Sequence, residues 1–461
     1  MKFGGTSVED APAFARVGRI VKERVPLRPV VIVSAMSGLT DTLIECVRRV
    51  ERGENERKLL EQQLERHGEV ARELLSGELL TSFLTLLEKS RAELFAVLQK
   101  ISERGSAEAG LRDRAIAFGE DLSSNLLELV LREQGVMAKQ FDSRRCIITN
   151  DEHGSATPIV SQTFRNTKAF LRPLLAADTT PVLGGFIAAN ANGETTTLGR
   201  GGSDYSAALI GAALGASEIQ IWTDVNGVLT ADPRVVAGAH TVPHLSYAEA
   251  AELAYFGAKV LHPKTIQPAV ESGIPVRICN SRAPDEPGTL VCAEGDATPR
   301  GVKAIAHKTG VTTIQITSAR MLGAYGFLRA LFELFDNHQT VVDVVTTSEV
   351  SVSLSVDAAP SAALLDQLQD LGSVRLEDGR AIVCVVGAGL RGTPGIAARV
   401  FNTISDINVS LISQGASSVN LTFAVDEQFV GQAVSRLHAE FFEATKALAS
   451  NVQRPTSKVR I

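Results

Sequence analysis

Long apolar runs are missing from this chain of 461 residues, so a membrane-spanning helix of ordinary length is not expected. The first ten residues, MKFGGTSVED, also lack the apolar core of a signal peptide, and we expect a cytoplasmic location. Only five cysteines occur, and none belongs to a CxxC pair. This scarcity argues against a disulfide framework and fits a reducing compartment.

Several catalytic signatures are absent as well. The chain contains no Gly-Lys dipeptide, which excludes a P-loop, and neither HRD nor DFG, which excludes a protein-kinase fold. His240 and His244 stand four residues apart, but Pro243 lies between them and no glutamate follows the first. We therefore predict no metal site built from protein ligands.

Charge of one sign is in modest excess. The formal net charge is −6, with 21% charged and 44% hydrophobic residues, which is typical of a globular protein without membrane spans. A net negative charge argues against nucleic acid or an anionic membrane as the main partner. Any anion site must be a local basic pocket. The length predicts two to four domains.

The stretch from Thr195 to Ala216, TTTLGRGGSDYSAALIGAALGA, carries the strongest local signal. It reads as strand residues, a glycine loop and a helix whose first turn holds Ser203 and Asp204. Free N–H groups and the dipole at a helix start attract anions, and Arg200 adds a fork of donors suited to carboxylate or phosphate. The alternative is an ordinary capped helix with Arg200 in solvent.

Two more junctions repeat this pattern near the start of the chain. Lys2 to Ser7 is a short strand end with a glycine pair and two hydroxyls, and residues 29–35 (PVVIVSA) read as a buried strand leading to MSGLTD. Beside phosphates, Lys2 would act as a point charge and the amides of Gly4 and Gly5 as a cradle. Three such junctions predict a doubly wound sheet with its site at the strand ends.

Residues 56–104 are rich in Leu, Glu, Arg and Lys and predict two or three helices packed on the sheet, rather than a coiled-coil arm. Residues 111–131 predict another helix, which carries Glu120. A helical glutamate usually lies in solvent, so periodicity alone gives Glu120 no function.

The C-terminal third contains a repeat. The segment 350–357 (VSVSLSVD) matches 419–426 (VNLTFAVD), and at the same offset Gly326 matches Gly395 and Phe332 matches Phe401. The order of elements in each copy predicts two βαββαβ modules of ferredoxin-like type. The segment 387–392 (GAGLRG) fits a dinucleotide motif, but too little chain follows it for such a domain.

Together these residues resemble the aspartokinases, within the amino-acid kinase superfamily, and most closely the monofunctional lysine-sensitive type. The matching motifs are KFGGTSV at Lys2, GRGGSDY around Arg200, WTDVNGV at Trp222, TADPRV at Thr230, FGAKVLHP at Phe256 and TTSEVSVSL at Thr346. The resemblance covers nearly the whole chain.

The resemblance implies an α/β fold with a three-layer amino-acid-kinase (carbamate-kinase-like) domain and two α+β ferredoxin-like ACT domains. We expect the catalytic domain at 1–297 and the first ACT domain, which binds the effector, at 311–379. It is inserted into the second ACT domain, formed by 300–310 and 380–461.

The implied activity is ATP-dependent phosphorylation of the β-carboxylate of L-aspartate, the first step of lysine, threonine and methionine biosynthesis, with Mg²⁺ bridging phosphate oxygens. The implied catalytic residues are Lys2, Arg200, Asp204 and Lys259. Aspartate would contact Thr40, Glu120, Arg200, Gly201, Gly202 and Ser203. The nucleotide would contact Lys2, Phe3, Gly4, Gly5, Thr223, Asp224, Leu229, Arg234, Lys259 and Val260.

The resemblance also implies feedback inhibition by L-lysine through the first ACT domain. The corresponding positions are Met321, Ala324, Phe327, Leu328, Val341, Val342, Asp343, Ser348 and Glu349. Two carboxylates, Asp343 and Glu349, suit a ligand with two ammonium groups, although they could instead cap turns at the domain edge. A homodimer or dimer of dimers through the ACT domains is expected.

Two other functions stay open at this point. One is a different amino-acid kinase, for glutamate or acetylglutamate, although those lack the pairing of KFGGTSV with tandem ACT modules. The other is a non-catalytic amino-acid sensor that kept the fold, against which the presence of Lys2, Glu120, Arg200, Asp204 and Lys259 argues.

Overall fold

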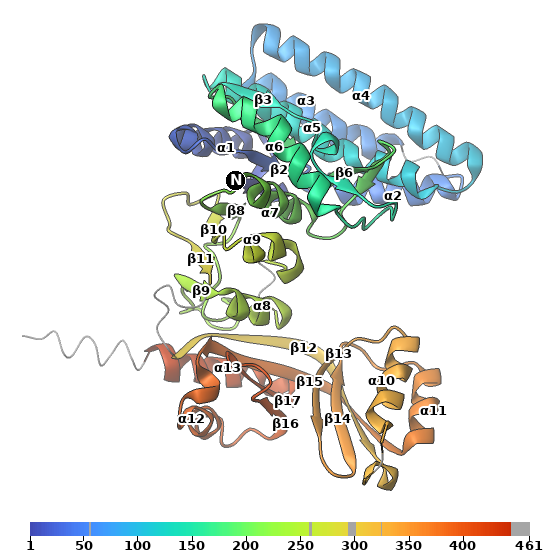
Figure 1. Ribbon diagram of the computed structural model, residues 1–461, viewed down its shortest axis with the longest axis vertical. Coiled ribbons are helices and arrows are strands. Elements are labelled where there is room, and N and C mark those ends of the chain that lie inside the picture. The colour runs from blue at the N-terminus through green and yellow to red at the C-terminus, as the bar shows by residue number, and fades with distance from the viewer. Residues whose placement is uncertain (55–56, 258–260, 294–300, 324, 444–461) are drawn as a thin grey trace, which may run out of the picture. The chain divides into compact units, whose positions relative to one another are not determined.

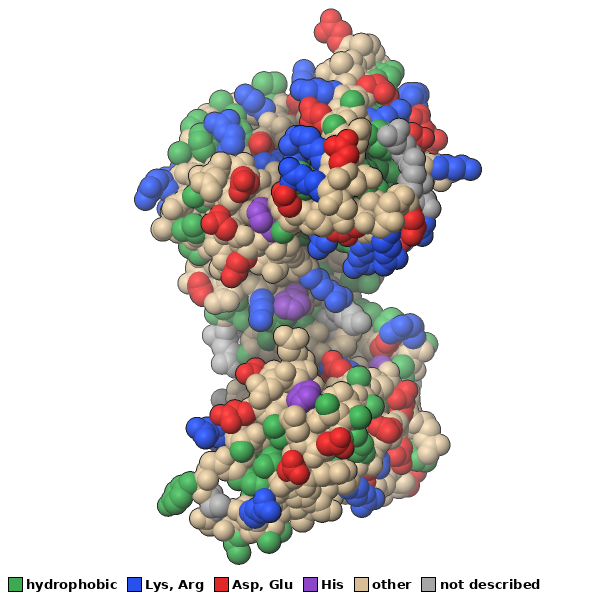
Figure 2. Space-filling view, turned by 90° about the vertical axis from the view of Figure 1, so that its right-hand side faces the viewer, with side chains coloured by type: hydrophobic (Ala, Val, Ile, Leu, Met, Phe, Trp, Pro, Cys, Tyr) green, Lys and Arg blue, Asp and Glu red, His purple; other side chains and the backbone are tan. Residues whose placement is uncertain are grey.

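The computed structural model describes residues 1–54, 57–257, 261–293, 301–323 and 325–443 (Figure 1). The chain divides into two compact units. The first is Met1–Val228 with Val260–Asp296, and the second is Leu229–Lys259 with Ala297–Ile461. None of the described helices has the length and apolar character needed to cross a membrane. On the face drawn in Figure 2, acidic and basic side chains are interspersed rather than gathered by sign.

The first unit is built on a mostly parallel sheet. Within the unit the strand order is β3 (Ala138–Gln140), β5 (Thr180–Gly184), β2 (Val31–Val33), β1 (Lys2–Phe3), β8 (Ile219–Thr223), β10 (Val276–Asn280) and β11 (Thr289–Cys292). All neighbours pair in parallel except β10 and β11. Every residue of β2 and β5 is buried, because helices cover both faces of the sheet.

Two helical layers cover this sheet (Figure 1). One contains α1 (Ala11–Arg24), α2 (Leu39–Glu51), α3 (Arg57–Leu74), α4 (Gly77–Arg104) and α5 (Ala109–Glu133), which share one apolar core with Phe3 and Trp222. The other contains α6 (Val160–Ala176), α7 (Gly202–Leu214) and α9 (Gln267–Glu271). The predicted helices of 56–104 are α3 and α4, and they pack on α2 and α5. A small sheet of β4 (Ile148–Thr149), β6 (Ile187–Asn190) and β7 (Thr195–Thr197) completes the unit.

The second unit contains one antiparallel sheet, in the order β13 (Val342–Thr347), β14 (Ser351–Val356), β12 (Gly301–Thr317), β15 (Ser373–Ala388), β17 (Asn420–Asp426) and β16 (Val409–Gln414). Its helices are α10 (Phe327–Asn337), α11 (Ala362–Leu371), α12 (Ile396–Thr403) and α13 (Val430–His438). Strand β9 (His244–Ser246) and helix α8 (Tyr247–Tyr255) belong to the same unit.

The internal repeat is confirmed by this sheet. The first helices of the two copies, α10 and α12, begin after glycines in the left-handed region, Gly326 (φ 83°) and Gly395 (φ 80°). Strands β12 and β15 run through both copies, and their pairing shifts register near Gly310 and Gly379, both with positive φ. The predicted fold class, an α/β domain followed by antiparallel modules of ferredoxin-like type, is therefore confirmed.

The segment 229–259 differs from its predicted surroundings. Ala231 and Val236 join the apolar core formed by β15, β17 and α13, and the amide of Ile305 donates to the Thr230 carbonyl oxygen at 2.8 Å. Sequence reasoning placed this segment in a domain ending at 297, whereas Thr230, Ala231 and Val236 pack here in the second unit. The domain limits stay a prediction.

Candidate active site

A cavity of about 670 Å³ opens at the carboxyl ends of β1 and β2, beside the start of α7. This is where open parallel sheets commonly bind ligands. Most of the cavity wall comes from four segments far apart in the chain, and it contains Lys2, Gly5, Thr40, Glu120, Arg200, Gly201, Gly202, Ser203 and Asp204. The structure thus brings together the residues for which sequence reasoning predicted contacts with the amino acid.

Lys2 and Asp204 form an ion pair in this cavity. The Lys2 Nζ lies 2.7 Å from the Asp204 Oδ1, and the two side chains are 12% and 16% exposed. Lys2 projects from the short strand β1, and Asp204 lies in the first turn of α7. Water competes weakly for a pair this well shielded, so Asp204 fixes the position of the ammonium group.

The glycine loop before α7 holds Arg200 at the cavity. Gly199 (φ 71°) and Gly201 (φ 73°) both adopt left-handed backbone, which other residues reach only with strain, and Gly201 is the N-cap of α7. The Arg200 side chain is exposed, and the described part of the chain offers it no hydrogen bond or ion pair. A guanidinium without an internal partner at a cavity is available to a carboxylate ligand.

Glu120 is buried rather than in solvent. It is only 3% exposed, and its Oε2 has no hydrogen-bond partner among the described residues. Burial raises the pKa of the Glu120 carboxyl to about 8, against a hydrogen bond from the backbone of Ala35 that lowers it. An orphaned carboxylate oxygen in a cavity wall is suited to receiving an ammonium group.

Close backbone approach shapes the remainder of the wall. A side chain at Gly185 would place its Cβ 2.6 Å from that of Ser203, so only glycine allows the loop after β5 to approach α7. The next residue, Phe186, has φ 64°, and its amide donates to Ser206 Oγ at 3.0 Å. A non-glycine residue in this region is strained, and such residues cluster at functional sites.

The predicted nucleotide contacts are only partly assembled. Phe3 is fully buried and stacked on Trp222, and the Gly4 amide donates to the Trp222 carbonyl at 3.1 Å. That amide is therefore not available to a phosphate, contrary to the predicted Gly4–Gly5 cradle. Thr223 is the last residue of β8 and Asp224 follows it, while Leu229 and Arg234 belong to the second unit. Lys259 and Val260 lie outside the described residues.

Two residues that sequence reasoning missed organise the cavity. Arg66 on α3 donates to the carbonyls of Ser37 (3.0 Å) and Glu9 (2.9 Å), and so ties together the loops after β1 and β2. Asp113 on α5 is fully buried and lies in the cavity wall. Neither residue belongs to a recognisable motif, and the helical periodicity around each gives no sign of these contacts.

The predicted effector positions lie on neighbouring elements of the second unit. Met321, Phe327 and Val342 pack against one apolar core, Leu328 and Val341 are exposed, and Ser348 and Glu349 form the turn between β13 and β14. Ala324 lies outside the described residues.

Asp343 has an unexpected partner. Its Oδ2 lies 2.8 Å from the Lys308 Nζ, Lys308 also pairs with Asp357, and the Tyr255 hydroxyl donates to Asp343 Oδ1. Burial raises the pKa of Asp343, although the hydrogen bonds from Lys308 and Tyr255 act in the opposite direction. The carboxylate predicted to bind an effector ammonium is thus already paired with an ammonium of the chain itself.

Comparisons with known proteins agree with this arrangement. The model of the amino acid kinase family matches residues 1–280, and an ACT domain model matches 383–441. The lysine-sensitive aspartokinase 3 of Escherichia coli is 38% identical over 96% of this chain and 98% of its own length. The chloroplastic aspartokinase 2 of Arabidopsis thaliana is 36% identical over 96% of this chain and 84% of its own length.

Solved structures give the same result. E. coli aspartokinase III in complex with aspartate and ADP (R-state) superposes with a TM-score of 0.79 at 36% identity, covering 96% of this chain and 99% of its own. The complex of the same enzyme with lysine and aspartate (T-state) superposes with a TM-score of 0.80 at 36% identity, covering 96% of this chain and 98% of its own.

Proposed function

The chain belongs to the aspartokinases of the amino acid kinase family, and from that premise we propose that it phosphorylates the β-carboxylate of L-aspartate with ATP. The product would be 4-phospho-L-aspartate, an acyl phosphate that opens the biosynthesis of lysine, threonine and methionine. One observation carries the proposal most directly. Lys2, Glu120 and Arg200, from distant parts of the chain, line one cavity with complementary charges for an amino acid and a phosphate.

The cavity offers a partner for each charged group of aspartate. Arg200 would bind a substrate carboxylate through two parallel N–H···O bonds. Glu120 would accept from the substrate ammonium, together with the hydroxyl of Thr40, which lines the same cavity. These contacts would leave the β-carboxylate facing the phosphates, where positioning supplies much of the rate enhancement.

Phosphoryl transfer asks little covalent chemistry of the protein. A β-carboxylate oxygen attacks the γ-phosphorus, the bond from that phosphorus to the bridging oxygen breaks, and ADP leaves with the electron pair. Lys2, held by Asp204 at 2.7 Å, would neutralise negative charge on the phosphates during this step.

Mg²⁺ would arrive bound to ATP and neutralise charge on its phosphate oxygens. The described residues contain no group of three or more His, Cys, Asp or Glu side chains able to hold a metal ion. Thr223, Asp224, Leu229, Arg234, Lys259 and Val260 remain the proposed nucleotide positions.

We also propose feedback inhibition by L-lysine at the first ferredoxin-like module. The E. coli enzyme that this chain resembles is named lysine-sensitive, and one of its structures contains lysine with aspartate in a T-state. A ligand inhibits in this way only if it binds the inactive conformation more tightly than the active one. The division into residues 1–297, 311–379, and 300–310 with 380–461 is kept as part of this proposal.

The C-terminal modules would also join two copies of the chain. Exposed apolar side chains gather on the first module, at Leu322, Tyr325, Leu328, Phe332 and Val341. A surface of this kind suits a symmetric contact. Light scattering that reports a monomer at micromolar concentration would argue against it.

The five cysteines are all free thiols, which supports a reducing compartment such as the cytoplasm.

The reaction is tested by trapping the acyl phosphate with hydroxylamine. We expect ATP-dependent hydroxamate from L-aspartate, and almost none from L-glutamate or N-acetyl-L-glutamate, with inhibition by L-lysine. Preference for either of the other acids would indicate a different amino-acid kinase. Absence of hydroxamate with all three would favour a non-catalytic sensor.

A further inference from the structure

We propose that Asp113 is a positioning residue for aspartate, which fixes the loop that carries Arg200 relative to the helix that carries Glu120. The inference rests on the proposed function, because it assigns Arg200 and Glu120 to the amino-acid substrate. Asp113 itself would act through these two residues.

Both oxygens of the Asp113 carboxylate have hydrogen-bond partners. Its Oδ2 accepts from the amides of Gly154 (2.9 Å) and Thr197 (3.1 Å) and lies 3.0 Å from His153 Nδ1. Its Oδ1 accepts from the Thr197 hydroxyl at 2.8 Å. The side chain is only 1% exposed. A single carboxylate therefore joins three segments, namely helix α5, the 153–154 loop and strand β7.

The contacts of Asp113 lead directly to Arg200. Thr197 is the last residue of β7, and its carbonyl accepts from the Ala156 amide at 2.8 Å. Both the amide and the carbonyl of Thr197 are therefore hydrogen-bonded. Two residues later, Gly199 packs against Ser155, where an added Cβ would approach the Ser155 Cβ to 3.2 Å. The 153–156 loop and β7 are therefore held together, and Arg200 directly follows Gly199.

The same helix carries Glu120. Asp113, Ile116 and Glu120 recur at helical spacing on α5, and all three line the cavity. A change at Asp113 would thus alter the separation between a carboxylate-binding guanidinium and an ammonium-binding carboxylate. Such a change should affect aspartate much more than ATP, because the predicted nucleotide contacts Thr223 and Asp224 lie at the end of β8 and directly after it.

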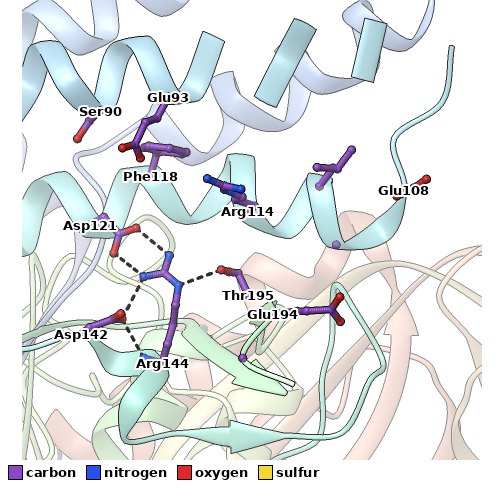
Figure 3. A pocket seen from close by; sticks show the side chains of 13 residues that line it. Ser90, Glu93, Glu108, Arg114, Phe118, Asp121, Asp142, Arg144, Glu194 and Thr195 are labelled. Atoms are coloured by element: carbon purple, nitrogen blue, oxygen red, sulfur yellow. Dashed lines mark hydrogen bonds and ion pairs between the residues drawn. The ribbon is translucent and has the colours of Figure 1, made fainter. Parts of the chain in front are cut away.

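Asp121 on α5 provides a matched control. It faces a different cavity of about 580 Å³, where its two oxygens accept from Arg144 at 2.8 and 3.0 Å (Figure 3). Arg144 is also bound to Asp142 and to Thr195, the first residue of β7, so Asp121 reaches that strand only through a second side chain and not at Thr197, next to the Arg200 loop. Asp121 and Asp113 are thus both carboxylates on one helix that tie it to neighbouring segments, but only Asp113 lies in the wall of the proposed substrate cavity.

The test compares Asp113→Asn, Thr197→Val and Asp121→Asn in the hydroxamate assay with the full-length chain. Asparagine keeps the size of Asp113 but turns an amide donor toward groups that themselves donate. We expect the KM for aspartate to rise about tenfold in Asp113→Asn, with the KM for ATP changing less than about twofold. Thr197→Val removes the hydrogen bond from the Thr197 hydroxyl to Asp113 and keeps the shape of the side chain. It should raise the KM for aspartate by a smaller factor, again with little change in the KM for ATP.

Asp121→Asn should lower the melting temperature without a selective effect on aspartate. Adding Asp113→Asn to Arg200→Ala should have little further effect on the KM for aspartate, because the two residues act on one contact. The inference is overturned if Asp113→Asn raises both KM values equally, or if the effects of Asp113→Asn and Arg200→Ala are additive. Should Asp113→Asn fail to fold, an unchanged KM in Thr197→Val would overturn it. A wild-type chain inactive on aspartate would reject the proposed function itself.

Discussion

At the scale of single residues, the candidate site is marked by charged groups whose bonding is incomplete. Arg200 has no partner in the described chain, and one oxygen of Glu120 is buried without a hydrogen bond. Folded proteins rarely leave a buried carboxyl oxygen such as that of Glu120 unsatisfied, because it costs free energy, whereas the exposed Arg200 guanidinium is free to bind a ligand. The ligand that satisfies both must carry an anionic and a cationic group, as an amino acid does.

Replacing Arg200 by alanine tests whether this residue binds a carboxylate of the substrate. Each lost charge-assisted hydrogen bond is worth roughly 1.5–3 kcal/mol, so we expect kcat/KM for aspartate to fall by tens of times or more. Initial rates at varied aspartate and saturating ATP measure the effect. Arg200→Lys should recover only part of the loss, since an ammonium cannot make the bidentate contact. Unchanged aspartate kinetics in the alanine variant would remove Arg200 from the site.

The pH dependence of aspartate binding tests whether Glu120 binds the ammonium group of the substrate. With its pKa raised to about 8, Glu120 carries a proton in the free enzyme at neutral pH. A bound ammonium favours the carboxylate, so binding below that pKa releases a proton. The KM for aspartate should therefore fall as pH rises to about 8, by about tenfold per pH unit, and then level off. Glu120→Gln should have a higher KM with no such slope, and an identical profile in that variant would contradict the assignment.

Sequence reasoning singled out Arg200, Lys2 and Asp204, which line one cavity in the structure, because glycine-rich loops at helix starts are a local and recognisable pattern. It could not anticipate the bonding of Asp113 or Arg66, whose partners lie up to 84 residues away in the chain. The use of the Gly4 amide within the sheet was also hidden, because it depends on the pairing of β1 with β8.

At the scale of elements, the repeat was readable because matching strands alternate and matching helices follow glycine. The sequence did not predict that β12 continues from Gly301 to Thr317 as a single strand, since Gly310 in its middle reads as a break. Pairing with β15 on one side, and with β14 along its second half, keeps it extended. Similarly, Thr230, Ala231 and Val236 pack within the second unit through contacts with residues that are distant in the sequence.

A residue in the turn between β13 and β14, Glu349, provides the first test of lysine regulation. Glu349 is exposed there, without an ion pair among the described residues. We expect Glu349→Ala to raise the lysine concentration for half inhibition with little change in turnover, because an ammonium partner is lost. Inhibition curves at fixed aspartate measure this, and a normal response to lysine in that variant would make the effector assignment wrong.

Lys308 on strand β12 provides the second test of lysine regulation. Its ammonium already occupies the Asp343 carboxylate, so it would compete with the ammonium of an effector. Lys308→Met should therefore lower the lysine concentration needed for half inhibition. Lys303→Met is a suitable control, because Lys303 on the same strand pairs with Glu249 instead, at 2.7 Å. Weaker inhibition in Lys308→Met would show that Lys308 supports the effector site instead of competing for it.

At the scale of the whole molecule, the candidate active site and the predicted effector positions lie in different compact units of one chain. A kinase-type α/β domain provides the cavity, and a repeated antiparallel module provides the predicted effector surface. Lysine can control such an enzyme only by a difference in affinity between two conformations, and by linkage it should weaken aspartate binding as much as aspartate weakens lysine binding.

The chemical claim at the centre is that an oxygen of the aspartate β-carboxylate forms a bond to the γ-phosphorus of ATP. L-aspartate labelled with ¹⁸O in that carboxylate tests it, with ATP, Mg²⁺ and hydroxylamine present. Hydroxylamine attacks the acyl carbon, so the released phosphate should retain one labelled oxygen, as mass spectrometry would show. Unlabelled phosphate formed at the rate of ATP consumption would contradict carboxylate phosphorylation.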